Sequence, residues 1–182
     1  SFFFFFAGRD SDRASAKASA SLLTLMDETN FHVYDLATQK FTSLAVKNYR
    51  NYRLAVGEAA AALYDGFSLC FYDPKDGTIS AEKTRERYQH ARLDAAGSVI
   101  AFYNGDRWKV MNLKSGNQEE AATESSAKRA WQLVSAEGAL LYDGKSLIGY
   151  SAARSRFDRI LLGAEITPVT VPVLKTINGK FH

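Results

Sequence analysis

Few side chains in this chain are suited to catalysis or metal binding, and they are scattered along the sequence. The 182 residues include three histidines, His32, His90 and His182, and one cysteine, Cys70. No two histidines have the spacing of metal ligands on one element, and no motif joins the cysteine to a histidine as nucleophile and base. The sequence also has neither a nucleophile elbow nor a phosphate-binding glycine loop. We therefore predict no catalytic residues, no bound metal and no cofactor, and we expect Cys70 to be a small buried side chain.

Asp or Asn recurs directly before glycine at a constant interval. Asp65-Gly66, Asn104-Gly105 and Asp143-Gly144 follow one another every 39 residues. A ring of such oxygens could bind a cation, but Asp and Asn precede glycine in tight turns for backbone reasons alone. We interpret these residues as turn residues.

The best candidate binding residues lie in three basic segments that precede repeated apolar runs. The segments are 47–53 (KNYRNYR), 83–92 (KTRERYQHAR) and 127–131 (AKRAW), and each carries an aromatic residue. Arginine and aromatic side chains are the usual energetic anchors of protein interfaces. The predicted binding residues are Tyr49, Arg50, Tyr52, Arg53, Arg87, Tyr88, Lys128, Arg129 and Trp131.

The charge pattern narrows the class of partner. Basic segments with interleaved aromatics suit an acidic protein surface or a phosphate-bearing partner, although loop charges also serve to keep strand edges soluble. The net charge is only +3, and no RNA-binding motif is present. We expect the partners to be other protein subunits. A narrower prediction is that the partner carries acidic or phosphate groups. We do not expect nucleic acid.

The elements that would position these residues are short repeated strands. The stretch Leu63–Gly77 (LYDGFSLCFYDPKDG) reappears as Phe102–Gly116 (FYNGDRWKVMNLKSG) and as Leu141–Ser155 (LYDGKSLIGYSAARS), with a fainter copy at Leu25–Gln39. A period near 39 without helical apolar spacing indicates a repeated β unit. Asp-Gly or Asn-Gly between apolar runs predicts hairpins, because both tolerate the positive φ of a two-residue turn. With an apolar run before the unit and a weaker segment after it, each copy predicts four strands.

Units of this kind resemble the WD40-like and quinoprotein-like repeats of β-propeller proteins. The resemblance includes the tail 34–40 (YDLATQK), echoed at 72–78 and 111–117. The Trp-Asp and Gly-His pairs of the WD family and the repeated Trp of the quinoprotein family are missing, so no subfamily is assigned. The resemblance implies an all-β fold, a β-propeller or partial propeller of about four four-stranded blades. The copies form either a four-bladed ring or part of a larger ring completed by residues or subunits absent from this chain, and we favour the second.

Composition divides the chain into three parts. Residues 22–162 hold the predicted blades, 163–182 a C-terminal extended segment, and 1–21 an apolar segment followed by a linker. The run Phe2–Phe6 is far shorter than the roughly 20 residues that span a bilayer. It is either an extended segment packed against protein or the end of a signal or anchor segment that begins before Ser1. The second alternative would place the protein in the periplasm or at a membrane.

Two functions follow from these observations. The first is a non-catalytic interaction platform, a subunit or domain of a larger assembly that binds partners through its loop faces. The alternative is a propeller enzyme, a hydrolase or a quinone-dependent dehydrogenase, with residues from separate blades meeting at the central channel. An enzyme would show several acids or histidines converging on a polar pocket there.

The platform interpretation predicts the result of a charge reversal. Replacing Arg50, Arg53, Lys128 and Arg129 with Glu should leave the fold intact, because all four lie in loops or at a strand start, and should abolish co-purification of the partner. Circular dichroism would check the fold, and a pull-down would check the partner. Retention of every partner would show that the binding face is misassigned.

Overall fold

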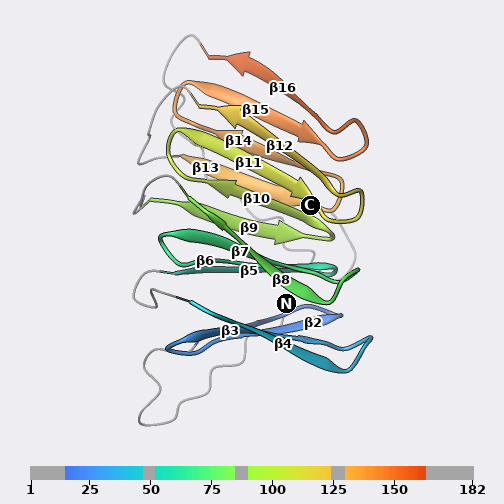
Figure 1. Ribbon diagram of the computed structural model, residues 1–182. Coiled ribbons are helices and arrows are strands. Elements are labelled where there is room, and N and C mark those ends of the chain that lie inside the picture. The colour runs from blue at the N-terminus through green and yellow to red at the C-terminus, as the bar shows by residue number, and fades with distance from the viewer. Residues whose placement is uncertain (1–14, 47–51, 85–89, 124–129, 163–182) are drawn as a thin grey trace, which may run out of the picture.

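The chain folds into four antiparallel sheets of four strands each, which confirms the predicted all-β architecture. The computed structural model describes residues 15–46, 52–84, 90–123 and 130–162, and each sheet, or blade, comes from one of these ranges (Figure 1). Blade 1 holds β1 (Ser15–Ala18), β2 (Leu22–Met26), β3 (Asn30–Asp35) and β4 (Lys40–Ala45). Blade 2 holds β5 (Arg53–Gly57), β6 (Ala60–Tyr64), β7 (Ser68–Asp73) and β8 (Thr78–Lys83). Blade 3 holds β9 (Arg92–Ala96), β10 (Val99–Tyr103), β11 (Arg107–Asn112) and β12 (Asn117–Ala122). Blade 4 holds β13 (Trp131–Ser135), β14 (Gly138–Tyr142), β15 (Ser146–Ser151) and β16 (Arg156–Leu161).

The burial of each strand follows from its place in the blade. Strands β6 and β10 are buried along their whole length, because a neighbouring blade covers each of their faces. Their sequences, AAALY and VIAFY, are correspondingly apolar throughout rather than alternating. The fourth strands β8 and β12 form the rim and are mostly exposed, which explains why their sequence signal is weak.

The blades stack face to face in chain order, with blade 1 at one end of the stack and blade 4 at the other (Figure 1). Three apolar clusters lie between successive blades. The first joins Met26 and Phe31 to Leu63, the second joins Tyr64 to Phe102, and the third includes Trp108 and Ile148. Each cluster draws on two blades, so the hydrophobic core of this protein is a series of blade interfaces.

Buried hydrogen bonds between side chains also join neighbouring blades. The Tyr72 hydroxyl of blade 2 donates to Asp35 Oδ2 of blade 1 over 2.9 Å, with both side chains buried. Between blades 3 and 4, Gln132 accepts from Trp108 Nε1 at 3.0 Å and donates to Asp94 at 2.9 Å. Buried polar groups of this kind are costly when unpaired, so these links favour one register between blades.

Close approach of the inner turns requires small residues. A Cβ on Gly57 would lie 2.7 Å from the Gly97 carbonyl oxygen, and a Cβ on Gly97 would lie 2.7 Å from Ala136 Cβ. Gly97 also has a φ of 55°, in the left-handed region that favours glycine. Any larger side chain at Gly57 or Gly97 would push successive blades apart at this edge.

One strand, β1, lies outside the range in which the sequence predicts blades. Strand β1 pairs with β2 inside the range 1–21, which composition predicts as an apolar segment and linker, so the linker assignment is wrong for Ser15–Ala18. Its small residues need no deep burial, because cross-strand hydrogen bonding holds them. Strand β16 completes blade 4 although its sequence, RFDRIL, is charged and mostly exposed.

Several predicted features lie outside the described residues. The Phe2–Phe6 run and the C-terminal segment 163–182 are among them. In the four described ranges, no helix is long and apolar enough to cross a membrane.

The link between Tyr72 and Asp35 predicts a pH dependence of stability. Burial would raise the pKa of Asp35, but the hydrogen bonds from Tyr72 and from two backbone amides outweigh it and leave that pKa below its usual value. Burial, followed by the hydrogen bond to Asp35 and its charge, raises the pKa of Tyr72 from 10.0 to about 12. Since the raised pKa favours the neutral phenol in the folded chain, the stabilisation is complete below pH 10 and is lost as the pH rises towards 12.

The variant Tyr72→Phe should lower the free energy of unfolding by about 1–3 kcal/mol at neutral pH, since Asp35 loses a buried donor. Its alkaline fall in stability should also be smaller than that of the wild type. Urea unfolding from pH 8 to 12 would measure both effects. Parallel curves for the two proteins would show that Tyr72 does not couple stability to pH.

Candidate functional site

The stack has two loop-bearing sides, which we name by their loops. The connector face carries the turns between second and third strands, and each blade's first strand begins there, since Arg53 lies opposite Tyr64 and Trp131 lies opposite Tyr142. The turn face lies on the opposite side and carries the other two turns of every blade. The predicted Asp-Gly turns therefore lie on the same face as Arg53 and Trp131, where β5 and β13 begin.

The Asp-Gly turns are structural. Asp65 and Asp143 are buried. Asp65 Oδ1 accepts hydrogen bonds from the Phe67 and Ser68 amides at 2.8 and 2.7 Å, and Asp143 Oδ1 accepts from the Ser146 amide at 2.8 Å. These bonds use the carboxylate oxygens to close the turn, which confirms the turn interpretation. Within the described part of the chain, no group of three or more His, Cys, Asp or Glu residues could hold a metal ion.

A tyrosine completes each of these turns, and sequence analysis missed it. The hydroxyls of Tyr64, Tyr103 and Tyr142 donate to the carbonyls of Gly66, Gly105 and Gly144 at 3.2, 3.1 and 3.1 Å. The three glycines have φ values of 91°, 106° and 100°. Because side chains disfavour this backbone conformation, the turn requires glycine at this position. The repeated Tyr-Asp-Gly and Tyr-Asn-Gly tripeptides were the signal for this cap.

Three of the predicted binding residues are described. Arg53 is exposed and donates through a guanidinium nitrogen to the Tyr52 carbonyl at 3.1 Å, while Tyr52 is partly buried against the cluster between blades 1 and 2. Trp131 is 37% exposed at the start of β13. The other predicted residues lie outside the described ranges, so the role of this face stays a prediction: Tyr49, Arg50, Arg87, Tyr88, Lys128 and Arg129.

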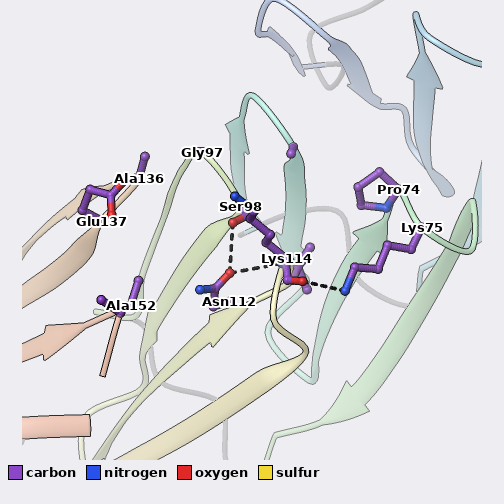
Figure 2. Close-up of a pocket in the computed structure, with 12 residues that line it drawn as sticks. Pro74, Lys75, Gly97, Ser98, Asn112, Lys114, Ala136, Glu137 and Ala152 are labelled. Atoms are coloured by element: carbon purple, nitrogen blue, oxygen red, sulfur yellow. Dashed lines mark hydrogen bonds between the residues drawn. The ribbon is translucent and has the colours of Figure 1, made fainter. Parts of the chain in front are cut away.

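The turn face carries an open groove with a volume of about 510 Å³. It crosses blades 2, 3 and 4, and each blade contributes residues from its first–second turn and its third–fourth turn (Figure 2). The groove lies between these two rows of turns. Its lining residues are Ala59, Pro74, Lys75, Gly97, Ser98, Asn112, Leu113, Lys114, Ala136, Glu137, Ala152 and Ala153.

Polar groups in the groove are held by the chain itself. Asn112 Oδ1 accepts from the Ser98 hydroxyl at 3.0 Å and from the Lys114 amide at 3.1 Å. Lys75 Nζ donates to the Lys114 carbonyl at 2.7 Å, so the lysine side chain lies along the groove edge between blades 2 and 3 (Figure 2). The two lysines lie on the blade 2–3 side, and Glu137 lies on the blade 4 side. The groove is therefore electrically asymmetric along its length.

Sequence reasoning missed the groove because its residues are small and lie in turns. Ala59, Gly97 and Ala136 provide little side chain, so the floor exposes backbone and methyl groups. The sequence does indicate this floor, because small residues occur in the first–second turn of three successive copies.

A smaller cavity of about 230 Å³ lies between blades 2 and 3. Lys109 of blade 3 forms an ion pair with Glu82 of blade 2 there, and Arg107 pairs with Glu120 inside blade 3. Both acids are therefore neutralised by a neighbouring cation. The cavity wall therefore holds two ion pairs, and Lys83 adds a further cation to its lining.

One set of side chains in blade 1 has the connectivity of a proton relay. His32 Nε2 lies 2.8 Å from Asp27 Oδ2, and His32 Nδ1 lies 2.7 Å from the Ser43 hydroxyl. The hydrogen bond from His32 lowers the pKa of Asp27 to about 2, with help from the turn amides. Sequence analysis treated His32 as isolated, because Ser43 reaches it only through the pairing of β3 with β4.

Cys70 is buried between blades 1 and 2. Burial, together with the charge of Asp65, raises the pKa of the thiol to about 12. A thiol with that pKa is not a nucleophile at neutral pH, so the predicted packing role of Cys70 is confirmed.

Comparison with known proteins identifies the fold. No protein-family model and no curated protein sequence matches this chain, but solved structures do. The apo structure of AztD from Citrobacter koseri superimposes with a TM-score of 0.50 and 12% identity, over 82% of this chain and 47% of that one. A chain of the mitotic checkpoint complex gives a TM-score of 0.49 at 14% identity, over 83% and 51%. The dihydro-heme d1 dehydrogenase NirN gives 0.46 at 15% identity, over 88% and 39%.

The four stacked blades and the likeness to AztD define the fold of this chain. The chain is a β-propeller repeat protein in partial form, with four four-stranded blades, as the resemblance implied. At such low identity the likeness concerns the fold alone, and a fold of this kind hosts many activities. The chain spans about half the length of the AztD chain that it matches.

Proposed function

We propose that this protein is a non-catalytic interaction platform that binds a segment of a partner protein in the turn-face groove. The lining of the groove carries the proposal. It consists mainly of backbone, alanine and other small side chains, and Glu137 is its one carboxylate among the described residues. Acid–base chemistry needs several titratable groups that converge, whereas peptide recognition needs reachable backbone and shallow apolar pockets.

The shape and charge of the groove indicate the kind of segment. Because it crosses three blades, an extended chain would contact each in turn. Lys75 and Lys114 on one side and Glu137 on the other favour a segment with an acidic end over blades 2 and 3 and a basic end over blade 4. The connector face, with Arg53 and Trp131, is proposed as a second contact surface on the same partner assembly.

Blocking the groove tests this proposal. Ala153 is exposed in the turn before β16, so Ala153→Trp should fill part of the groove without disturbing a blade interface. We expect a loss of the partner that co-purifies with the wild type, and a cross-link map that places this partner beside Lys75 and Lys114.

The matched control is Ala81→Trp, which adds the same side chain at an exposed position of β8 outside the groove lining. This variant should retain the partner. Equal binding by Ala153→Trp and Ala81→Trp would exclude the groove as the binding site.

A hydrolase is the second candidate, and the series Asp27–His32–Ser43 is the observation that favours it. Ser43 would be the nucleophile, His32 would accept its proton through Nδ1, and Asp27 would hold the imidazolium through Nε2. The arrangement lies at the outer strands of blade 1 rather than at the central channel expected for a propeller enzyme.

Serine-reactive chemistry distinguishes the two candidates. A hydrolase with this site should be labelled by a fluorophosphonate probe at Ser43, and Ser43→Ala and His32→Gln should both lose the label. Intact-protein mass spectrometry would record it. An unlabelled wild type under conditions that label a serine hydrolase control would eliminate this candidate.

A further inference from the structure

One hydroxyl at a blade interface has no partner within the described part of the chain. Tyr150 of β15 is 4% exposed and belongs to the apolar cluster between blades 3 and 4. Its phenolic oxygen is covered and forms no hydrogen bond with any described residue. Because buried polar atoms in proteins are nearly always paired, and an unpaired one costs free energy, this exception needs a physical explanation.

The equivalent hydroxyl two blades earlier is paired. Tyr72 and Tyr150 occupy the same register, since each lies opposite the second residue of the neighbouring strand, β6 or β14. The Tyr72 hydroxyl donates to Oδ2 of Asp35, the last residue of the third strand in the preceding blade. Asn112 is the last residue of the third strand in blade 3. Asn112 therefore stands to Tyr150 as Asp35 stands to Tyr72.

An asparagine at this position cannot accept the tyrosine hydroxyl. Asn112 Oδ1 accepts from the Ser98 hydroxyl and from the Lys114 amide. Because the Lys114 amide can only donate, this bond fixes which side-chain atom is the oxygen and which is the nitrogen. Where an aspartate would offer a second oxygen, Asn112 offers an NH₂ group, which accepts no hydrogen bond. Tyr150 is left unpaired as a result.

The side-chain nitrogen of Asn112 is available to the groove. Asn112 is 8% exposed and lines the groove. Both hydrogen bonds that its side chain forms among the described residues use Oδ1, and Nδ2, unlike the Tyr150 hydroxyl, is not fully covered. In Figure 2 the nitrogen points away from Ser98 and Lys114, on the side of the view where Ala152 of blade 4 lies. A side chain that is nine-tenths buried thus presents an unpaired donor to the groove.

The presence of Asn rather than Asp has opposite effects on stability and on binding. It leaves a buried hydroxyl unpaired, and it places a hydrogen-bond donor in the wall of the groove. Neither Asp35 nor Tyr72 is among the residues that line the groove, so the paired form of this link lies away from it and the unpaired form lies beside it. Binding sites commonly lose stability to local features that function requires.

We propose that Asn112 selects the occupant of the groove by donating a hydrogen bond from Nδ2 to a main-chain carbonyl oxygen of the bound segment. This inference rests on the function proposed above and names the chemistry at one point of that site. An NH₂ group can only donate, so it selects an acceptor oxygen. A carboxylate of the segment would bind at the groove edge, where Lys75 and Lys114 lie, because a charge buried beside a neutral side chain lacks a countercharge. Main-chain carbonyls are the acceptors that every extended segment brings.

The variant Asn112→Asp tests the comparison with Asp35 without any ligand. The new carboxylate should accept from the Tyr150 hydroxyl and raise the melting temperature by about 2–4 °C. The same substitution in a Tyr150→Phe background should give no gain, and Tyr150→Phe alone should melt with the wild type because its hydroxyl has no partner to lose. Differential scanning calorimetry would measure all four proteins. The absence of a gain, or a gain that persists without the hydroxyl, would overturn the inference.

The same variant should weaken binding while it stabilises the fold. The probe is the ten-residue peptide that binds the wild type most tightly in a random phage-display selection, labelled with fluorescein. Its dissociation constant on Asn112→Asp, measured by fluorescence anisotropy, should rise about ten-fold, since a donor is replaced by an acceptor that repels the carbonyl oxygen. A version of the peptide with Gln in place of every Asp and Glu should show the same rise. If the rise disappears with that version, Asn112 acts on side-chain charge and the inference is wrong.

The matched control is Asn104→Asp, the same substitution in the same blade but on the connector face. Asp occupies the equivalent turn position in blades 2 and 4, as Asp65 and Asp143, so this variant should fold. It should bind the peptide with wild-type affinity. An equal loss of affinity in Asn104→Asp would show that an added negative charge alone explains the effect, and would remove the assignment to Asn112.

The groove variant Ala153→Trp separates this inference from the function on which it rests. A peptide that still binds Ala153→Trp does not occupy the groove, and that result, like a selection that yields no peptide, contradicts the proposed function and this inference with it. A peptide that Ala153→Trp excludes but Asn112→Asp binds with wild-type affinity would keep the groove as the binding site and overturn the role of Asn112 alone.

Discussion

The packing of one blade against the next is the interaction on which this structure depends. A blade of four short strands has two apolar faces and cannot bury either one alone, so each sheet depends on packing against a neighbouring blade. The buried strands β6 and β10 show this directly, since their side chains are covered on both sides by other blades. Stability is therefore shared along the stack of described blades.

Polar side chains set the register of this packing. Asp65 and Asp143 satisfy turn amides, and Tyr64 and Tyr142 cap the glycine carbonyls of the same turns. Blade-to-blade links such as Gln132 with Trp108 act over longer sequence distances. Because buried polar groups lose much free energy when unpaired, these bonds favour a single alignment that apolar contacts alone would specify loosely. The repeat is thus stabilised by apolar area and aligned by hydrogen bonds.

The functional surfaces follow from where the packing leaves the chain uncovered. Turns and connectors at the two loop faces are free to vary without affecting the blade cores, as is usual for binding sites on rigid scaffolds. On the turn face, close stacking of Gly57, Gly97 and Ala136 keeps the inner turns small and leaves a groove beside the outer turns. The loop faces proposed for partner binding are therefore separate from the blade faces that form the core.

The sequence by itself determined the local structure: the 39-residue period, the Asp-Gly hairpins, the four-stranded unit and the packing role of Cys70 all follow from neighbouring residues. It missed β1, because SAKA is held by pairing with the adjacent strand rather than by an apolar pattern of its own. Only the tertiary structure decided which side chains meet across strands and blades, such as His32 with Ser43, Tyr72 with Asp35, and the turns that line the groove. Contacts of this kind depend on strand register and on the angle between blades, which are set by the summed packing of many residues and have no signature in a single stretch of sequence.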